Sequence, residues 1–498
     1  MNATRFDPME TTVGEVHAAF EVGSLTAVEL VDWYLERIDA YDGALRAILT
    51  VNSAATDRAR ALDEALEREG LTGPLHGIPI VLKDNHDTHD LPTTAGSEAL
   101  AGSVPDRDAF VVRRLREAGG IVLAKANLQE FSFGVDTISS LGGETRNAYS
   151  LSHRPSGSSG GTAAAIAANL GTLGTGSDTC SSVRSPPAFN GLVGLRPTMG
   201  LVSRAGIVPL STTQDTAGPI TRTIEDAARL LDAMVGYDPD DPLTAVGADA
   251  PPAGGYVSHL DERGLDGARI GVVRSLFGLA DDSLALTEEA AAITELTDSA
   301  VREMEDAGAT IVDPVSVADP ESLDAARLVR LEFARDLNRY LEDRHDVPDT
   351  LVEIVDADLV HPWIRERIED AAILEVDTES VSERREYLRR RVRREELRTD
   401  TLSRMIDAEV DALLYPPSAV PPVPLPDRQP FSEMRCELAA HTGLPAIVVP
   451  AGYTDGGLPV GVELLGKPFG EPRLFELAYA YERATEHRRP PEAFGPVE

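Results

Sequence analysis

Short apolar runs alternate with helical patterns along this chain, and that alternation most limits the folds open to it. Residues 78–82 and 121–124 are apolar runs, and residues 108–118 between them have a helical pattern closed by Gly119. The same order returns at 269–273, 288–307 and 310–312, and further strands are predicted at 446–449 and 460–464 before a helix over 471–484. Strand, helix and strand at this spacing predict an α/β fold in which helices cover the faces of a sheet.

The other segments predict how a single domain of residues 1–498 is organised. Residues 1–70 are expected to be helical, because Thr12 with Glu15 and Thr26 with Glu29 have capping-box spacing. A core over 73–235 follows, and the Pro-, Gly- and Asp-rich stretch 238–260 is a loop or linker. Residues 240–410 are variable and mostly helical, and 411–498 returns to strands. One sheet with a helical insertion is therefore predicted, rather than separate domains.

The chain is strongly acidic and almost free of lysine. Its 83 Asp and Glu residues outnumber 46 basic residues, which gives a net charge of −37, and only Lys83, Lys125 and Lys467 are lysines. Phosphate contacts need clustered cations, so no direct contact with nucleic acid is expected. The basic stretch 382–398 has interleaved Glu residues, which favours a solvated helix face over a polyanion site.

Such a surface suits a salt-rich cytosol, in which mobile ions screen the repulsion between carboxylates. A halophilic source is therefore predicted, with basic partners in an ordinary cell as the alternative.

Two cysteines, Cys180 and Cys436, are too few for a disulfide framework, which predicts a reducing compartment. The first residues lack an apolar signal segment, and no run of 18 apolar residues occurs. A cytoplasmic protein outside the membrane is expected.

A glycine- and serine-rich block over 154–198 is the candidate site. Residues 160–170 predict a small-residue helix about 16 Å long at 1.5 Å per residue. Residues 171–175 can return over the same distance as a strand, so the following loop comes back to the start of that helix. This geometry places Ser158 and Ser182 within reach of each other, beside the free amides of a helix N-terminus.

Lys83 is the third candidate, because it ends the apolar run of the first predicted strand. Active sites of α/β sheets collect where strands end. In a chain that uses arginine almost everywhere else, a lysine at this position needs a chemical reason. Unlike a guanidinium, a desolvated ammonium can give up its proton.

These segments together resemble the amidase signature family of serine hydrolases, in which a Ser–cis-Ser–Lys triad cleaves carboxamides. The resemblance runs through GPLHGIPIVLKDN (73–85), TTAGSEAL (93–100), the Gly/Ser block, QDTAGPITRTIEDAARLLD (214–232) and the C-terminal LPAIVVPAGYTDGGLPVGVELLGKPF. It is weakest over 240–410. It implies a large mixed sheet flanked by helices, with a helical insertion before the C-terminal strands.

The resemblance also implies roles for individual residues. Ser182 resembles the nucleophile, Ser158 the bridging serine on a cis peptide, and Lys83 the base. An oxyanion hole is implied from the amides of Thr179, Cys180, Ser181 and Ser182. Substrate-binding positions are implied for Phe131, Phe133, Ser159 and Gln214, where core packing is an equal alternative for the two phenylalanines.

Two departures from the family pattern concern backbone geometry. Cys180 and Ser181 stand where the family usually has a glycine pair, and Ser156 replaces a usual glycine. Side chains there make a positive φ less accessible, so a tighter oxyanion pocket is expected. Arg184 and Asp178 are expected to fix the loop that carries Ser182.

Three alternatives compete with this site. GSSGG at 157–161 also satisfies GxSxG, which would make Ser159 a nucleophile with His441 as its base. His86 and His89 lie among carboxylates and could suggest a metal, but a solvated acidic loop is the simpler interpretation, and no metal or cofactor is expected. Cys180 could be a catalytic thiol, yet its position favours a small residue in the wall of the site.

The predicted function is hydrolysis of a carboxamide to a carboxylate and ammonia or an amine, with a small-molecule amide as substrate. The first alternative is the glutaminase-type A subunit of a tRNA-dependent amidotransferase, which would need partner subunits. The second is a non-catalytic scaffold that binds a ligand. Assembly into a homo-oligomer is compatible with the sequence.

Overall fold

An 11-stranded sheet runs through the molecule, and its order mixes early and late segments of the chain. The computed structural model describes residues 6–281 and 283–497. Residues 1–5, which belong to the N-terminus predicted to lack a secretory signal, lie outside the described residues. From one edge to the other the strands are β1 (Ile48–Val51), β3 (Ile121–Ala126), β2 (Pro79–Lys83), β6 (Leu173–Asp178), β8 (Thr216–Thr221), β7 (Val193–Arg196), β12 (Ala446–Tyr453), β13 (Pro459–Leu465), β11 (Ala412–Tyr415), β9 (Arg269–Val272) and β10 (Thr310–Val312).

The sheet is mixed, as predicted, and helices flank it. β2 pairs in parallel with β3 and β6, whereas β6 with β8 and β12 with β13 are antiparallel pairs. A separate two-stranded sheet joins β4 (Ile138–Ser139) and β5 (Gly143–Glu144). The helices are α1 (Val13–Glu21), α2 (Ala27–Leu45), α3 (Ala55–Glu69), α4 (Phe110–Glu117), α5 (Gly160–Ala167), α6 (Ser185–Phe189), α7 (Ile224–Met234), α8 (Thr287–Asp306), α9 (Pro320–Asp324), α10 (Val329–Leu341), α11 (Leu351–Asp356), α12 (Pro362–Asp370), α13 (Arg385–Asp407), α14 (Glu437–Thr442) and α15 (Glu471–Thr485).

The two capping boxes predicted in the N-terminal segment are present, although strand β1 also lies within this segment. Thr12 and Thr26 each accept a hydrogen bond from the backbone amide three residues later, and Glu15 and Glu29 complete the two capping boxes. Four strands of the main sheet lie outside the sequence predictions, namely β1, β7, β8 and β11. The sequences of β7 and β8 include glycines at which a Cβ would come 2.0 Å from a neighbouring carbonyl oxygen, at Gly194 and Gly218. Their strand character comes from close backbone packing, which apolar periodicity does not reveal.

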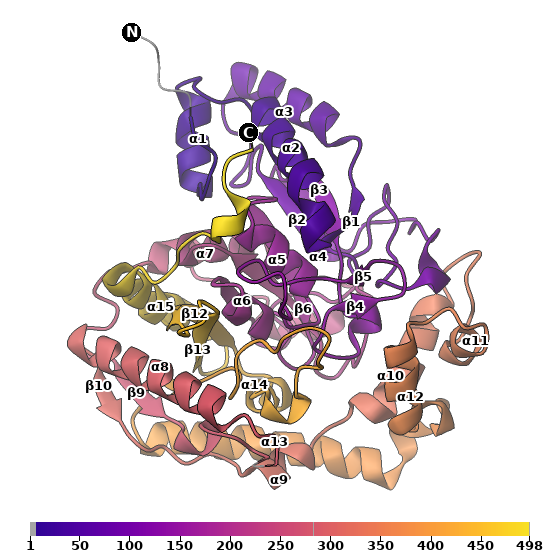
Figure 1. Cartoon of the computed structure of the whole chain (residues 1–498), viewed down its shortest axis with the longest axis vertical. Helices are drawn as coiled ribbons and strands as arrows, with labels where there is room; N and C mark the ends of the chain where they lie inside the picture. The colour runs from indigo at the N-terminus through magenta and orange to yellow at the C-terminus, as the bar shows by residue number, and fades with distance from the viewer. Residues whose placement is uncertain (1–5, 282, 498) are drawn as a thin grey trace.

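The insertion contains both sheet and helix. β9, α8 and β10 form the second predicted strand–helix–strand unit, and the parallel pair β9 and β10 extends the main sheet. Helices α10, α11 and α12 gather at the right of the view, beside β4 and β5, while α1, α2 and α3 lie at the top (Figure 1). A second apolar cluster joins Phe133 to α10–α12, so the insertion packs on the core next to the candidate site. In the described chain no helix is long and apolar enough to cross a membrane.

Candidate active site

Two adjacent parallel strands bring the candidate residues to one edge of the sheet. β2 and β6 pair in parallel, with Ile80 opposite Leu173, so both strands finish at the same side. β2 ends at Lys83 and β6 ends at Asp178, from which the loop carrying Ser182 leads into α6. Ser158 lies just ahead of α5, which packs against both strands. This is the carboxyl edge at which α/β sheets place their active sites.

Lys83 is buried, and its amine is held by serine side chains. Its Nζ atom donates to Ser158 Oγ at 2.7 Å and to Ser177 Oγ at 2.9 Å. Burial lowers the pKa of Lys83 to about 7, against the opposing attraction of Asp178 and Asp215. An amine with this pKa is available in its neutral form near neutral pH, as a proton acceptor requires.

Ser158 has the backbone geometry that the family resemblance implies. The peptide bond between Gly157 and Ser158 is cis, and the Ser158 side chain is fully buried. Its carbonyl accepts a hydrogen bond from the Gln129 amide at 3.0 Å. Ser156, two residues earlier, has a φ of +64°, a left-handed conformation that glycine adopts more readily than serine.

The loop of Ser182 presents backbone donors to a cavity. Thr179, Cys180, Ser181 and Ser182 all line this cavity of about 230 Å³. Among the described residues, none of their four amides donates to another group. Neither Cys180 nor Ser181 has a positive φ, so their side chains do not strain the backbone of the loop. Free amides beside a nucleophile are the arrangement that stabilises an oxyanion.

The loop is fixed from below by buried polar groups. Thr179 Oγ1 donates to Asp215 at 2.6 Å, and the Thr179 carbonyl accepts from Gln214 Nε2 at 2.7 Å. Gln214 therefore both lines the cavity and supports the oxyanion loop. Its side-chain carbonyl also accepts a hydrogen bond from Arg394 of α13.

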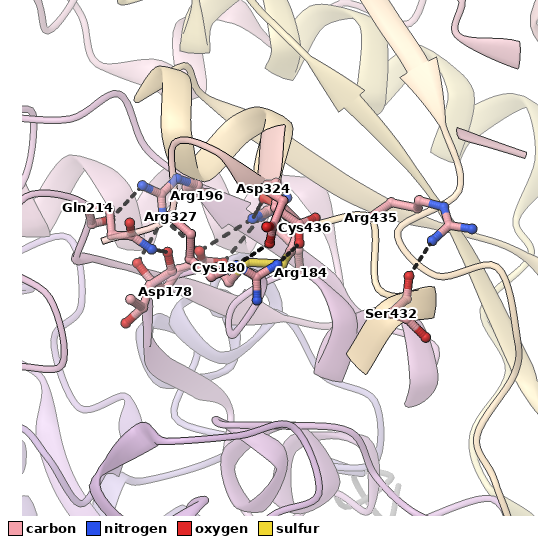
Figure 2. The surroundings of a disulfide bond; sticks show 12 residues. Asp178, Cys180, Arg184, Arg196, Gln214, Asp324, Arg327, Ser432, Arg435 and Cys436 are labelled. Atoms are coloured by element: carbon pink, nitrogen blue, oxygen red, sulfur yellow. Dashed lines mark hydrogen bonds and ion pairs between the residues drawn. A yellow bond between two sulfur atoms is a disulfide. The ribbon is translucent and has the colours of Figure 1, made fainter. Parts of the chain in front are cut away.

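Arg184 and Asp178 act as ion partners beneath the same loop, in agreement with the sequence prediction. Arg184 Nη1 lies 2.6 Å from Glu463, and its Nε lies 3.2 Å from Asp178. Arg196 contacts the other oxygen of Asp178 at 2.6 Å. Figure 2 shows Asp178, Arg184 and Arg196 next to Cys180. All of these side chains are buried, so removing one partner would leave an uncompensated charge.

Cys180 and Cys436 form a disulfide bond, which does not fit the reducing compartment predicted from their small number (Figure 2). The two residues are 256 positions apart, and their Cα atoms lie 4.9 Å from each other. A count of two cysteines excludes a framework of several bridges but says nothing about whether a distant pair meets in space. The bond ties the oxyanion loop to the residue that precedes α14. Because its sulfur is paired, Cys180 does not act as a catalytic thiol in this form.

The other predicted substrate positions divide between wall and core. Phe133 lines the cavity and stacks on Phe333 at a centroid distance of 5.1 Å. Phe131 is buried against the same ring and is a core residue. Ser159 is buried, and its hydroxyl donates to the Ser177 carbonyl at 3.4 Å. His441 lines the cavity from α14, but no hydrogen bond joins it to Ser159 among the described residues, and no strand ends directly before Ser159, since residues 145–158 contain none. The GxSxG alternative therefore has no support.

The histidines after β2 do not share one site. His86 is fully buried, and burial together with Lys83 and Lys125 lowers its pKa to about 3. His89 is exposed and lies 2.9 Å from Asp108. The segment from Asp84 to Thr88 is buried, so the expectation of a solvated acidic loop is wrong for it. The reason is that buried cations neutralise its carboxylates: Lys125 lies 2.9 Å from Asp84, and Arg344 pairs with Asp87.

Several wall residues were missed by sequence reasoning. They come from the insertion and the segment before α14, where the family pattern is weakest, and comprise Arg327, Arg330, Arg367, Ile373 and Phe431. Helical charge patterns like theirs are ordinary on a surface, so only the packing of the insertion shows that they face the cavity. Ser177, which holds Lys83, was also missed, because a serine inside a strand carries no sequence signal of its own.

Comparisons with known proteins agree with this geometry. A model of the amidase family matches residues 29–475. A probable amidase of Arabidopsis thaliana is 35% identical over 98% of this chain and 93% of its own length. The A subunit of the glutamyl-tRNA(Gln) amidotransferase of Halorhodospira halophila is 35% identical over 97% of this chain and 99% of its own.

Solved structures are similar over the same extent. A peptide amidase in complex with the competitive inhibitor chymostatin is 37% identical, with a TM-score of 0.86 over 98% of this chain and 100% of that one. The native peptide amidase of Stenotrophomonas maltophilia is 36% identical, with a TM-score of 0.83 over 97% of this chain and 99% of that one. Sequence and fold therefore lead to the same conclusion: the chain belongs to the amidase signature family of amide-hydrolysing enzymes.

Proposed function

We propose that the protein hydrolyses a carboxamide through an acyl-enzyme on Ser182, with Lys83 as the base acting through Ser158. The observation that carries this proposal is the 2.7 Å hydrogen bond from Lys83 Nζ to Ser158 Oγ, made by a fully buried amine whose pKa burial lowers to about 7. Ser182 lies at the wall of the adjoining cavity with four free amides around it.

The first half-reaction forms an ester. Neutral Lys83 accepts the proton of Ser158 while Ser158 accepts that of Ser182, and Ser182 Oγ bonds to the carbonyl carbon. The amides of residues 179–182 donate to the oxygen as it becomes negative, and each such donor is worth about 10²–10³ in rate. The proton then returns to the nitrogen, the C–N bond breaks, and ammonia or an amine leaves.

The second half-reaction consumes water. Lys83, neutral again, withdraws a proton from water through Ser158, and the resulting hydroxide attacks the ester carbon. The oxyanion forms in the same pocket, the C–O bond to Ser182 breaks, and Ser182 recovers its proton. The products are a carboxylic acid and the amine released earlier, and the cycle uses no cofactor.

Fluorophosphonate labelling with peptide mapping tests this assignment together with hydrolysis of an amide panel. Label is expected on Ser182, lost in Ser182→Ala, and strongly slowed in Lys83→Met. Ser403→Ala, which changes an exposed serine of α13, is the matched control and should label and hydrolyse normally. Label on another serine in active protein, or full activity in Ser182→Ala, would overturn the proposal.

The second candidate is a glutaminase-type A subunit, which the similarity to the A subunits of amidotransferases favours. It would require partner subunits, and its signature is ammonia release from glutamine in a co-purifying complex. Hydrolysis of simple amides by the isolated chain, with no activity on glutamine, would exclude the A subunit and support an amidase that acts without partner subunits.

The setting of the enzyme is also part of the proposal. The net charge of −37 supports a salt-rich medium and a small-molecule substrate rather than direct contact with nucleic acid. A cytoplasmic location and a homo-oligomer stay predictions. The disulfide counts against a strongly reducing location.

A further inference from the structure

The cavity beside Ser182 has a cationic wall in a strongly acidic protein. Its described lining includes three arginines, Arg327, Arg330 and Arg367, and no aspartate or glutamate. The whole chain carries 83 acidic residues against 46 basic ones, so this reversal is local. His441 is neutral and adds no further positive charge, because burial and the nearby Arg394 and Arg327 hold its pKa well below the usual range.

Arg367 differs from the other two in having no partner among the described residues. It lies on α12, with its guanidinium 5.4 Å from the ring centre of Phe133 and 6.0 Å from that of Phe431. Its side chain makes no hydrogen bond or ion pair with a described residue, and its buried Nε atom has no acceptor. Asp136 is the nearby opposite charge, but it lies beyond ion-pair distance and accepts from the Gln429 amide at 2.8 Å.

The two neighbouring arginines already make ion pairs or hydrogen bonds within the protein. Arg327 pairs with Glu437 at 2.7 Å and with Asp324 at 3.2 Å. Arg330 is exposed, and its Nε donates to the Ala371 carbonyl at 2.6 Å, which leaves its other nitrogens free to bind a ligand. Carboxylates therefore pair with Arg327, whereas Arg330 and Arg367 have no ion-pair partner among the described residues, and Arg367 is the less exposed of these two.

We infer that the substrate is an amide that carries a carboxylate, bound by Arg367 with help from Arg330, at the end remote from Ser182. The inference rests on the proposed function, because it assumes that the scissile amide lies at Ser182. A planar guanidinium pairs with a carboxylate through two parallel hydrogen bonds. Phe133, Val135 and Phe431 line the same cavity and fit an apolar spacer. The wall has no carboxylate for an ammonium group, so an α-amino group on the same substrate is disfavoured.

A matched substrate series tests this inference. Monoamides of linear dicarboxylic acids, from succinic to suberic, are compared with the neutral alkanamides of equal chain length. At the best length, kcat/KM for the carboxylated amide is expected to exceed that of the neutral one by about 10–100-fold, mainly through KM, because a charged hydrogen bond contributes that much. Glutaramate, the monoamide of glutaric acid, should exceed glutamine, which differs from it only by the α-ammonium group.

Arg367→Met assigns the preference to one side chain. The carboxylate-to-neutral ratio of kcat/KM should fall by about ten-fold or more, because the carboxylated amide loses its pairing with Arg367. Arg365→Met is the matched control on the same helix, since Arg365 pairs with Asp358 at 2.8 Å and does not line the cavity. A neutral amide hydrolysed as well as its carboxylated partner by the natural protein, or a ratio unchanged in Arg367→Met, would overturn the inference.

Binding separates this inference from the proposed function. Calorimetry measures the affinity of each monoamide for the Ser182→Ala protein, which cannot complete the reaction. Preferential binding of the carboxylated amide, lost when Arg367→Met is added, supports the anion site even if Ser182 proves not to be the nucleophile. Equal binding of both amides, with Ser182 still labelled by fluorophosphonate in the natural protein, would contradict the anion site. The proposed amidase activity would not be affected by that result.

Discussion

Lys83 gains its chemistry from the place where β2 ends. Its amine is buried at the carboxyl edge of the sheet, where Ser158 and Ser177 supply hydrogen bonds in place of water. Lys125 is equally buried but faces Asp84 at 2.9 Å, and Lys467 is half-buried. The same side-chain type therefore serves as an ion partner at one strand and as a candidate base at the next.

The pH dependence of hydrolysis should reflect Lys83. Protonated Lys83 cannot act as a base, so kcat/KM is expected to rise tenfold per pH unit below an apparent pKa near 7 and to level off above it. Lys83→Met should lower kcat by at least about 10²-fold. Initial rates between pH 5 and 9 measure the profile, and Lys467→Met should reproduce the natural curve. A flat profile with chemistry rate-limiting would contradict the assignment.

Ser156 carries a backbone conformation that suits glycine. Its φ is +64°, and its buried hydroxyl has no hydrogen-bond partner among the described residues. Ser156→Gly is expected to raise the free energy of unfolding by about 1 kcal/mol, since relief of a left-handed residue outweighs the added freedom of the unfolded chain. Denaturant titration measures the change, and Ser156→Ala, which keeps Cβ, should gain less. A loss of stability in the glycine variant would refute the argument.

At the scale of elements, the sequence predicted the helices and the strands that end at the candidate site better than the strands in the middle of the sheet. The capping boxes of α1 and α2 and the strand–helix–strand unit β9, α8 and β10 follow from local patterns, and all are present. The approach of Lys83 to Ser158 was predictable, because Lys83 ends a strand and Ser158 precedes the helix that packs on this strand. β7 and β8 were not predictable, because their pairing depends on glycines that admit neighbouring carbonyl oxygens.

The other features of the site could not be predicted from the sequence, for a related reason. The disulfide joins residues 256 positions apart, and Arg327, Arg330 and Arg367 reach the cavity from an insertion far along the chain from Ser182. No local pattern encodes such contacts. The segment after β2 is buried for the same reason, because Arg344, which follows α10 in the chain, pairs with Asp87. Single residues that could take part in the chemistry were thus predictable from the sequence. Their partners from distant parts of the chain could be identified only in the folded structure.

The disulfide at the oxyanion loop should affect both stability and rate. Cys436→Ser removes the link from Cys180 to the segment before α14, so the free energy of unfolding is expected to fall by about 2–5 kcal/mol. Looser amides at residues 179–182 should also lower kcat by about ten-fold with little change in KM. Thermal unfolding and steady-state kinetics, with and without dithiothreitol, measure both effects.

A double variant provides the control for this prediction. Cys180→Ser with Cys436→Ser should behave like the reduced natural protein and show no response to dithiothreitol. If reduction lowers the melting temperature but leaves kcat unchanged, the bond stabilises the fold without organising the oxyanion loop.

At the scale of the whole molecule, acidic charge is distributed over the surface while cations are drawn inward. Lys83 and Lys125 are buried, and so are Arg37, Arg154, Arg184, Arg196 and Arg222. Each of these arginines donates to backbone carbonyls or pairs with carboxylates, as Arg37 does with the carbonyls of Phe494 and Gly495. Buried carboxylates such as Asp178 and Glu463 accompany these cations, so most of the net negative charge of the chain lies on the exterior.

Salt should therefore stabilise the protein. The Debye length falls from about 10 Å at 0.1 M to about 3 Å at 1 M, which screens repulsion among surface carboxylates. The melting temperature is expected to rise steadily between 0.1 and 2 M KCl, as measured by scanning calorimetry. Sorbitol at equal osmolality is the control for solute exclusion, and an equal rise in sorbitol, or no rise in KCl, would contradict an electrostatic cause.

The bond between Cys180 and Cys436 also changes how the polypeptide is connected. Residues 181–435 become a covalent ring, from which the N-terminal and C-terminal segments leave at a single junction. A protease that cuts one surface loop inside this ring yields a molecule that still migrates at full mass on a denaturing gel, and it separates into two pieces only after reduction. The helices over the cavity can thus be nicked without being lost, and the nucleophile loop stays joined to the C-terminal strands.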